Sequence, residues 1–577
     1  MSLGSFALVL HSHLPYVIAH GKWPHGMDWL NEATAETYIP LLNILNELVE
    51  EGYSPKLTLG ITPILLEQLA DSTFKEELSD YLEQKIKSAE DDIVEFQRYK
   101  KDNLLKLALM WTKYYSGIKD DFENKYKRDL VASFKKLQDE NHIELITCAA
   151  THGYLPLLSQ DTSVQAQIKL GVRTYEKHFA KKPRGIWLPE CAYRPRYNWT
   201  PPVETSLGKP SYLRKGIDEF LSENGIDYFL VDSALLKGGK AIGVYIDRFE
   251  ALRQLWGRFE KEYQPREEDF DKTPREVYLV SSGGEGKKPV AILTRDPETG
   301  LQVWSGEWGY PGDGNYLDFH KKHFPGGHRY WKITSAKSDL ADKMEYYPPD
   351  ANRMVPENAA HFKGLIKRLL VEYNQKTGQK GIVCAPYDAE LFGHWWFEGT
   401  RFLKLVLQNI ADDPEIELTT CSKFLDESKP NKVISIPEGS WGEGGYHYIW
   451  LNKWTEWTWK HIYEDELWMY RLAERLKDTK DDNLNKILKQ LARELLLLEA
   501  SDWQFLISTW SARDYAELRL SEHHNNFVRL ASMAERYASK GKIDEGDWTF
   551  LGDCEKRDKV FQDLEIEWWA SVEYPAK

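Results

Sequence analysis

Two carboxylate-bearing stretches of the sequence contain the residue types that glycosidic-bond chemistry needs. GIWLPECAY at 185–193 presents Glu190 after an apolar run that contains Trp187. APYDAELFGHWWFEG at 385–399 presents Asp388 and Glu390 among aromatic residues. One carboxyl can attack or stabilise an anomeric carbon while the other protonates the leaving oxygen, and aromatic rings can stack on sugar faces. The pattern predicts a paired-carboxylate site for a carbohydrate.

Spacing alone does not decide which residues of these stretches carry the chemistry. Asp388 and Glu390 are two residues apart, so in extended backbone they would lie on the same face. Cys191 follows Glu190 and could act as a nucleophilic thiol. No Cys-His signature surrounds it, so we favour a small buried side chain behind the site.

Two histidines follow the first predicted strand. The apolar run 5–10 ends at His11 and His13. His-x-His is also a metal-binding pattern of barrel metallohydrolases, and a metal-dependent hydrolase is therefore an alternative. Because no further ligand set is evident, we expect the two imidazoles to hydrogen-bond sugar hydroxyls and expect no metal or cofactor.

Short apolar strands alternate with amphipathic helices along the chain. Pro189 cannot donate to a sheet ladder, so the strand before Glu190 should end there. Alternating strands and helices predict a parallel sheet, and polar residues at strand C-termini are typical of an α/β barrel or a doubly wound sheet. Strands are expected at 5–10, 56–60, 143–150, 185–188, 226–231, 290–294, 381–385 and 416–420.

The length of 577 residues predicts two or three domains. We expect a catalytic α/β region over 1–430, with a helical insertion at about 66–140 and a long irregular loop at about 236–290. The composition changes after Pro437, and apolar residues recur at helical spacing in 485–498. These features predict a C-terminal helical domain over 431–577.

Composition argues against several classes of function. A net charge of −15 does not fit nucleic-acid binding, for which a basic stripe is expected. The N-terminus lacks signal-peptide features, and no apolar stretch approaches membrane-spanning length. Five cysteines without a CxxC pair predict reduced thiols in the cytoplasm. Oligomeric state is left open, with a monomer as the expectation.

Taken together, five stretches resemble glycoside hydrolase family 57. They occur in the family's order and span nearly the whole chain: HSHLPY at 11–16, GITPIL at 60–65, GIWLPECAY at 185–193, APYDAELFGHWWFEG at 385–399 and ASDWQFLI at 500–507. The long fourth region and the Trp-rich helical segment resemble the family's 1,4-α-glucan branching enzymes. The resemblance implies an incomplete (β/α)7 TIM-like barrel followed by helical domains, retaining chemistry and no metal.

The resemblance also assigns roles to individual residues. Glu190 corresponds to the catalytic nucleophile and Asp388 to the general acid/base, whose carboxyls lie about 5–5.5 Å apart in retaining enzymes. Trp441 lies in a glycine-rich stretch, which predicts an exposed stacking ring, whereas the aromatic neighbours of Trp450 also suit helix packing. The substrate contacts that correspond to the family's are His11, His13, His152, Trp187, Arg295, Trp304, Gly312, Trp441, Trp450 and Asp502.

The resemblance implies a branching transferase that acts on α-glucans such as amylose or glycogen. An α-glucan hydrolase of the same family and a weakly active glucan-binding protein are the alternatives. In the branching subgroup, a loop with a tyrosine near its tip keeps water from the intermediate. Ile242 stands at that position here, and Tyr245 follows three residues later. This departure predicts measurable branching with an elevated hydrolytic fraction, or weak activity overall.

Overall fold

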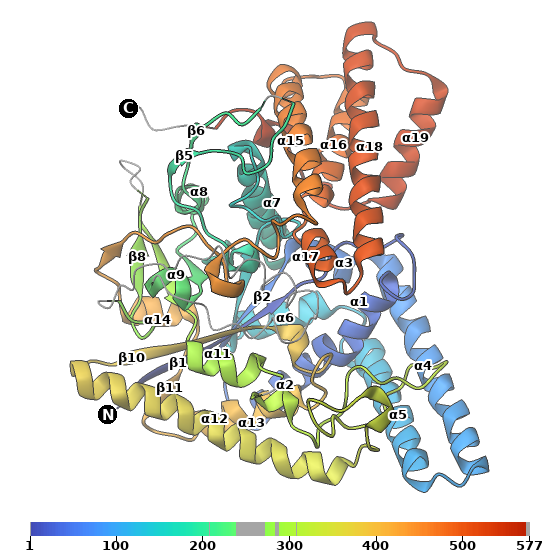
Figure 1. The fold of residues 1–577 in the computed structure, drawn as a ribbon, viewed down its shortest axis with the longest axis vertical. Coiled ribbons are helices and arrows are strands. Elements are labelled where there is room, and N and C mark those ends of the chain that lie inside the picture. Colours follow the sequence, from blue (N-terminus) through green and yellow to red (C-terminus); the bar gives the residue numbers. More distant parts are fainter. Residues whose placement is uncertain (1, 207, 238–271, 283–287, 307, 573–577) are drawn as a thin grey trace.

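A curled parallel sheet lies at the centre of the protein. The computed structural model describes residues 2–206, 208–237, 272–282, 288–306 and 308–572 (Figure 1). Within them, seven strands pair in parallel in the order β10-β1-β2-β3-β4-β7-β9. Their bounds are β1 Gly4–Ser12, β2 Leu57–Ile61, β3 Ile143–Cys148, β4 Gly185–Trp187, β7 Tyr228–Val231, β9 Val290–Thr294 and β10 Gly381–Asp388.

The two outer strands of this set almost close the sheet into a barrel. Arg295, just after β9, forms an isolated parallel bridge with Cys384 of β10. The amide of Asp296 donates to the carbonyl of Cys384 at 2.9 Å. The expectation of an incomplete seven-stranded TIM-like barrel is confirmed.

Further short strands extend the sheet or lie beside it. β8 (Tyr278–Val280) runs antiparallel to β9 and carries β12 (Val433–Ile434) on its other side, while β11 (Ile416–Leu418) pairs with β1. β5 (Tyr197–Trp199) and β6 (Tyr212–Arg214) form a separate antiparallel pair. The expectation of an irregular stretch over 236–290 was wrong for β8, because three residues next to a charged segment give too short a pattern to read.

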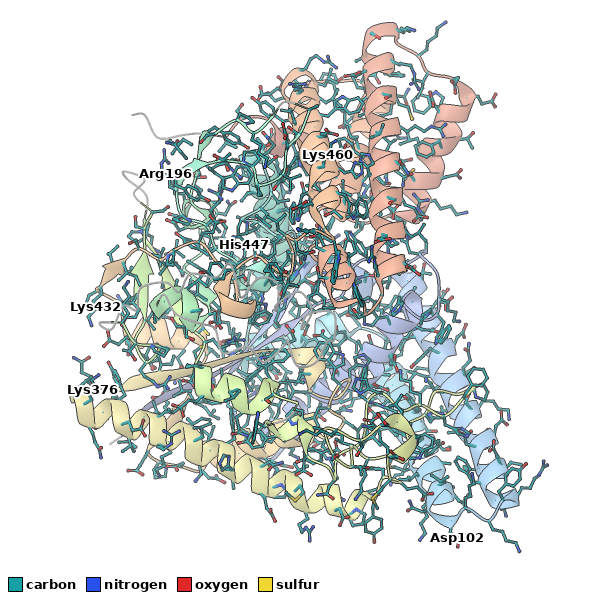
Figure 2. The ribbon with its side chains drawn as sticks, viewed as in Figure 1. Asp102, Arg196, Lys376, Lys432, His447 and Lys460 are labelled. Carbon is teal, nitrogen blue, oxygen red and sulfur yellow. The ribbon has the colours of Figure 1, made fainter. Side chains whose placement is uncertain are left out.

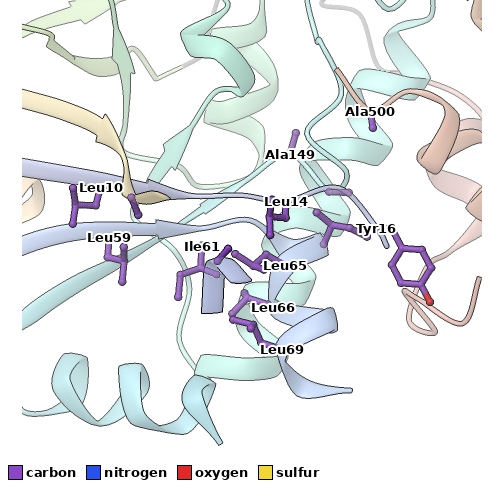
Figure 3. Close-up of a cluster of buried hydrophobic side chains, with 14 of the residues drawn as sticks. Leu10, Leu14, Tyr16, Leu59, Ile61, Leu65, Leu66, Leu69, Ala149 and Ala500 are labelled. Carbon is purple, nitrogen blue, oxygen red and sulfur yellow. The ribbon is translucent and has the colours of Figure 1, made fainter. Parts of the chain in front are cut away.

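Side chains of β1 alternate between two apolar cores. Phe6, Leu8 and Leu10 pack outward among the helices, whereas Ala7 and Val9 face the barrel interior. Figure 3 shows Leu10 on this outer side with Leu59 of β2 and the leucines of α3. The outer core thus holds the sheet against its helices.

Four of the five cysteines fill the barrel interior: Cys148, Cys191, Cys384 and Cys421. Cys191 is 1% exposed, and burial raises the pKa of its thiol well above the ordinary value. A protonated, covered thiol is a poor nucleophile. The structure therefore favours the packing interpretation of Cys191.

Helices cover the outside of the sheet (Figure 1). Apolar faces, such as that of α2 with Leu41, Leu42 and Leu45, pack on the strands. The helices of this layer are α1 Met27–Ala33, α2 Ile39–Glu50, α7 Asp161–Phe179, α8 Ile217–Glu223, α9 Ser233–Lys237, α11 Pro297–Trp304, α12 Pro348–Thr377 and α13 Gly399–Ala411. α14 Cys421–Glu427 packs Cys421, Phe424 and Leu425 into the interior cluster of the barrel.

The segment between β2 and β3 is helical, and it was predicted as an insertion at about 66–140. It comprises α3 Pro63–Ala70, α4 Ser72–Arg98, α5 Asp102–Asp120 and α6 Leu130–Asp139. In Figure 1, α4 and α5 lie side by side and project from the barrel.

The C-terminal part is a group of helices beside the barrel: α15 Glu456–Leu476, α16 Asp482–Leu498, α17 Asp502–Thr509, α18 Arg513–Lys540 and α19 Glu545–Arg557. Figure 2 places His447 near the middle of the molecule, and its Nδ1 pairs with the hydroxyl of Tyr154 at 2.8 Å. The boundary at residue 430 stays a prediction. No helix of the described residues has the length and apolar character needed to cross a membrane.

Candidate active site

The carboxyl ends of the parallel strands bring most of the predicted site residues to one end of the barrel. β1 contributes His11 and leads to His13, and β3 is followed by His152. Glu190 follows β4, and Asp388 ends β10 in register with His11. Residues almost 400 positions apart in the chain thus share one site.

Glu190 is held in an unusual backbone conformation. β4 stops at Trp187, and Pro189 opens a 3-10 turn in which Glu190 has φ 59° and ψ 26°. Left-handed backbone costs a non-glycine residue about 1–3 kcal/mol, so the surrounding structure must enforce it. The amide of Trp441 donates to the carbonyl of Glu190 at 3.1 Å and supplies part of that restraint.

Trp441 also holds the carboxylate of Glu190. Its indole Nε1 donates to Oε2 of Glu190 at 2.7 Å. Burial raises the pKa of Glu190 to about 7; the Trp441 hydrogen bond opposes this, and the charge of Asp502 adds to it. Glu190 is half-buried, so a ligand can reach it. Above this pKa it is an ionised carboxylate that accepts a hydrogen bond from the Trp441 indole, as an attacking group requires.

Asp388 has a different electrostatic environment. Burial raises the pKa of Asp388 well above its ordinary value, the charges of Glu390 and Glu190 raise it further, and Arg295 opposes them. These surroundings favour the protonated form of Asp388. A protonated carboxyl beside an ionised one is the pairing that acid-assisted bond cleavage needs.

Glu390 is buried and already engaged by protein groups. It is 4% exposed, and its Oε1 accepts from the Tyr38 hydroxyl at 2.5 Å and from the His13 amide at 3.0 Å. Asp388 is the more exposed of the two rival carboxyls. The geometry therefore favours Asp388 as the group that meets a ligand.

Three imidazoles form a layer beside the carboxylates. His11 stacks on Trp187 with 4.5 Å between ring centroids, and its Nε2 lies 3.1 Å from Nε2 of His152. Burial lowers the pKa of His11 and of His152 well below the ordinary value, so both rings are neutral. One of the two must donate to the other.

The C-terminal helices complete this layer. Asp502, in the first turn of α17, lies 3.0 Å from Nε2 of His13, whose Nδ1 pairs with the Thr62 hydroxyl at 3.1 Å. Ser501 pairs with Nδ1 of His152 at 2.8 Å, and its amide donates to the carbonyl of the same histidine. Barrel and C-terminal helices therefore both build the site.

His13, His152 and Asp502 lie close enough together to hold a metal ion. The two rings, however, stack with centroids 4.0 Å apart and planes only 14° from parallel. Imidazole lone pairs lie in the ring plane, and two nearly parallel stacked planes do not meet at one ion. The stacked arrangement suits hydrogen bonding better than chelation.

The tryptophans differ from the sequence-based prediction. Trp441 is half-buried, packed edge to face against Trp187 at 5.2 Å and Trp304 at 6.1 Å, and not the exposed ring expected from its glycine-rich surroundings. Trp187 and Trp304 are 0% and 3% exposed and form the wall behind it. In this arrangement only Trp441 offers part of its ring to a ligand.

Trp450 belongs to the core. It is 1% exposed and stacks on Tyr154 with 4.5 Å between centroids. The prediction that its ring stacks on a sugar is corrected, because the indole is buried and Tyr154 packs on its face. Its role is to pack the segment before α15 against the barrel.

Arg295 and Gly312 have different positions. Arg295 lies 5.5 Å above the Trp441 ring, and its Nη2 pairs with Asp232 at 2.5 Å. Gly312 lines a shallow surface pocket of about 350 Å³ with Trp308, and a Cβ there would meet the Gly306 carbonyl at 2.1 Å. Packing thus explains the glycine. Ile242 and Tyr245 lie outside the described residues, so the loop interpretation stays a prediction.

Sequence similarity now places the chain. The family model of glycosyl hydrolase family 57 matches residues 7–437, and that of the 1,4-alpha-glucan branching enzyme C-terminal region matches residues 461–569. This chain belongs to glycosyl hydrolase family 57. The resemblance inferred from five short motifs is confirmed.

Similar proteins match along the full length. The 1,4-alpha-glucan branching enzyme TK1436 of Thermococcus kodakarensis is 42% identical over 99% of this chain and 79% of its own. Its crystal structure has a TM-score of 0.88, with 99% of this chain and 98% of that chain covered. The GH57-type branching enzyme of Pyrococcus horikoshii is 41% identical, with a TM-score of 0.87 and coverage of 100% and 98%. The alpha-amylase AmyC of Thermotoga maritima is 30% identical, with a TM-score of 0.78 and coverage of 99% of each chain.

Three contributors to the site were missed from the sequence. Thr62 and Ser501 lie inside the motifs GITPIL and ASDWQFLI, so the motifs pointed to them without giving a role. Tyr38 lies in the π-helical turn Thr34–Tyr38 before α2, inside an ordinary-looking amphipathic pattern. Nothing in that periodicity reveals a π-helical turn, although such turns often occur at functional sites.

Proposed function

We propose that this family 57 enzyme is a retaining 1,4-α-glucan branching enzyme, which cuts α-1,4 bonds and forms α-1,6 branches. The observation that carries the proposal is the pair Glu190 and Asp388. Glu190 accepts a hydrogen bond from the Trp441 indole, and Asp388 lies close to the negative charges of other carboxylates. Full-length similarity to proteins named branching enzymes supports the choice of reaction.

In the first half-reaction, Glu190 attacks the anomeric carbon of the donor glucan. Asp388 gives its proton to the glycosidic oxygen as the C–O bond breaks, and the leaving chain departs as an alcohol. The product is a glycosyl ester on Glu190. The carboxylate loses its negative charge as the ester forms, and the hydrogen bond from the Trp441 indole weakens because an ester oxygen is a weaker acceptor than a carboxylate oxygen.

In the second half-reaction, Asp388 is the base. It takes the proton of an acceptor 6-hydroxyl, which attacks the anomeric carbon and frees Glu190. Two inversions retain the α configuration. The reaction needs no metal step, and the imidazoles of His11, His13 and His152 with Asp502 are assigned to the hydroxyls of the bound sugars.

Arg295 and Trp441 are assigned to sugar contacts beside the carboxylates, with Trp304 and Trp187 supporting the Trp441 ring. The carbohydrate partner is an α-glucan such as amylose or a glycogen-like chain. We also keep as proposals a monomeric state and a cytoplasmic setting, in which the five buried cysteines stay thiols.

An α-glucan hydrolase is the second candidate, because the 30% identical relative is named an alpha-amylase. Incubation with amylose separates the two, since hydrolysis creates a reducing end at each event and transfer creates none. We expect new α-1,6 linkages, scored by a debranching enzyme, to outnumber new reducing ends. Reducing ends without α-1,6 linkages would assign the chain to the hydrolases.

The loop prediction can be tested with the same assay. Ile242→Tyr is expected to raise the ratio of transfer to hydrolysis, and Tyr245→Ala is expected to change that ratio less.

A further inference from the structure

Glu390 occupies a position that the two-carboxyl mechanism does not use. It lies in the 3-10 turn η7 (Ala389–Leu391), directly after Asp388 ends β10. It is 4% exposed, yet a carboxyl is costly to bury unless other groups satisfy it. The residues that satisfy it indicate its role.

Two donors from other elements converge on one oxygen of Glu390. The Tyr38 hydroxyl donates at 2.5 Å from η1 (Thr34–Tyr38), and the His13 amide donates at 3.0 Å from the end of β1. Donors of this kind stabilise the ionised form of a carboxyl. Burial and the charge of Glu390 hold the pKa of Tyr38 well above its ordinary value, so Tyr38 remains a donor throughout the working pH range.

We propose that Glu390 is a positioning residue for Asp388: its fixed negative charge keeps the proton on Asp388 before the bond is cut and keeps Asp388 a strong base afterwards. Through the His13 amide it also ties the acid strand to the imidazole layer. The inference deepens the proposed retaining mechanism and rests on Asp388 being its acid/base.

Other charged groups near Asp388 and Glu390 also influence the protonation of the two carboxyls. Glu190 and Arg295 also face Asp388, and they act in opposite directions. Burial raises the pKa of Glu390, and its hydrogen bonds with Tyr38 and the backbone, together with the charge of His13, oppose that shift.

Glu190 and Glu390 differ in what happens to their charge during the reaction. Once Glu190 has become a glycosyl ester, its negative charge is gone, and Asp388 loses one of the two carboxylates that favour its protonated form. Glu390 forms no covalent bond, so its charge persists. Asp388 therefore still has a negative neighbour when it must take the proton of the acceptor hydroxyl.

Glu390→Gln tests this directly, because the amide oxygen can still accept from Tyr38 and His13 while the charge is removed. The alkaline limb of the pH profile of kcat/KM on amylose should move to lower pH by about one unit. At pH values above that limb, kcat/KM should therefore be about tenfold lower than that of the wild type. With α-maltotriosyl fluoride, whose leaving group needs no proton, the first release of fluoride should be unchanged. Tyr38→Phe should move the same limb in the same direction by less.

A matched control removes a similar bond elsewhere on the same π-helical turn. The Tyr115 hydroxyl donates to Glu36 at 3.1 Å, two residues before Tyr38. Tyr115→Phe should lower the melting temperature without moving the basic limb. A basic limb that stays at the wild-type pH in Glu390→Gln, or in Tyr38→Phe should the first variant not fold, would overturn the proposal. Loss of the fluoride release would instead point to a failure of the Glu190 assignment.

Discussion

The two strand ends that carry the paired carboxyls surround them with different neighbours. On the β4 side, Glu190 receives a 2.7 Å hydrogen bond from the Trp441 indole, which favours its ionised form. On the β10 side, Asp388 faces the carboxylates of Glu390 and Glu190, which favour its protonated form. Burial is the largest influence on the pKa of both residues and raises both, so it is their neighbours that differ.

This difference supports the proposed roles of Glu190 and Asp388. Two titratable groups whose surroundings push their pKa values apart form an acid and a nucleophile or base. Here the π-helical turn with Tyr38, the end of β1 and the segment around Trp441 supply those surroundings. Replacing each of these neighbours in turn should therefore change the charge state of one carboxyl and leave the other carboxyl as it is.

The largest effect should come from removing either carboxyl. Glu190→Gln and Asp388→Asn should each lower turnover on amylose by at least about a thousandfold while leaving the fold intact, because each group acts in the transition state. Steady-state assays of branching, with circular dichroism as the fold control, measure both quantities.

The same two variants should differ with an activated donor. Asp388→Asn should release fluoride from α-maltotriosyl fluoride in a rapid first turnover, since no proton is needed, whereas Glu190→Gln should not. If Glu190→Gln kept a tenth of wild-type activity on amylose, the nucleophile would have to be reassigned.

The next effect concerns the donor to Glu190. Trp441→Phe keeps a ring but removes the indole N–H, so the pKa of Glu190 should rise above about 7. Because a charged hydrogen bond contributes about 1.5–3 kcal/mol, kcat/KM at pH 6 should fall by at least about tenfold, with recovery toward pH 8.

Trp304→Phe is the matched control for this change. Trp304 touches the Trp441 ring edge to face, with 6.1 Å between centroids, so its replacement should affect packing. The acid limb of its pH profile should stay in place. An acid limb that moves equally in both variants would mean that the indole hydrogen bond is not what sets the charge of Glu190.

A smaller effect is expected on stability. The pKa of Glu190 is about 7 in the folded protein and about 4.3 in an unfolded chain, so ionisation costs the native state stability as pH rises between these values. Glu190→Gln should therefore melt a few degrees above wild type at pH 8, with the difference disappearing near pH 4. Thermal unfolding across this range measures it, and a difference independent of pH would contradict the account.

The smallest effect should follow metal removal. The stacked rings of His13 and His152 do not direct their lone pairs to one point, so branching should survive exhaustive chelation. Activity lost with EDTA and restored by zinc or manganese would move the chain to the metal-dependent hydrolases.

Features that depend on residues close together in the sequence could be predicted, whereas contacts between distant segments could not. The barrel strands and the helices between β2 and β3 could be predicted, because their apolar periods are local. The three-residue strand β8 escaped this reasoning, and so did the π-helical turn with Tyr38. The motifs predicted that Glu190 and Asp388 share one site. They did not predict the hydrogen bond to Glu190 from the Trp441 indole, which lies 251 positions from Glu190 in the sequence. Core packing of Trp450 was one of the interpretations that the sequence left open, but its stacking partner Tyr154 comes from another part of the fold and could not be predicted.

The most direct test of the account is to trap the covalent intermediate. Asp388→Asn incubated with α-maltotriosyl fluoride should form the glycosyl ester quickly and resolve it slowly, because the acceptor hydroxyl lacks its base. We predict that intact-mass spectrometry detects one added maltotriosyl group, and that peptide mapping places it on Glu190. A label on Glu390 or Cys191, or fluoride release with no label at any time, would contradict the assignment.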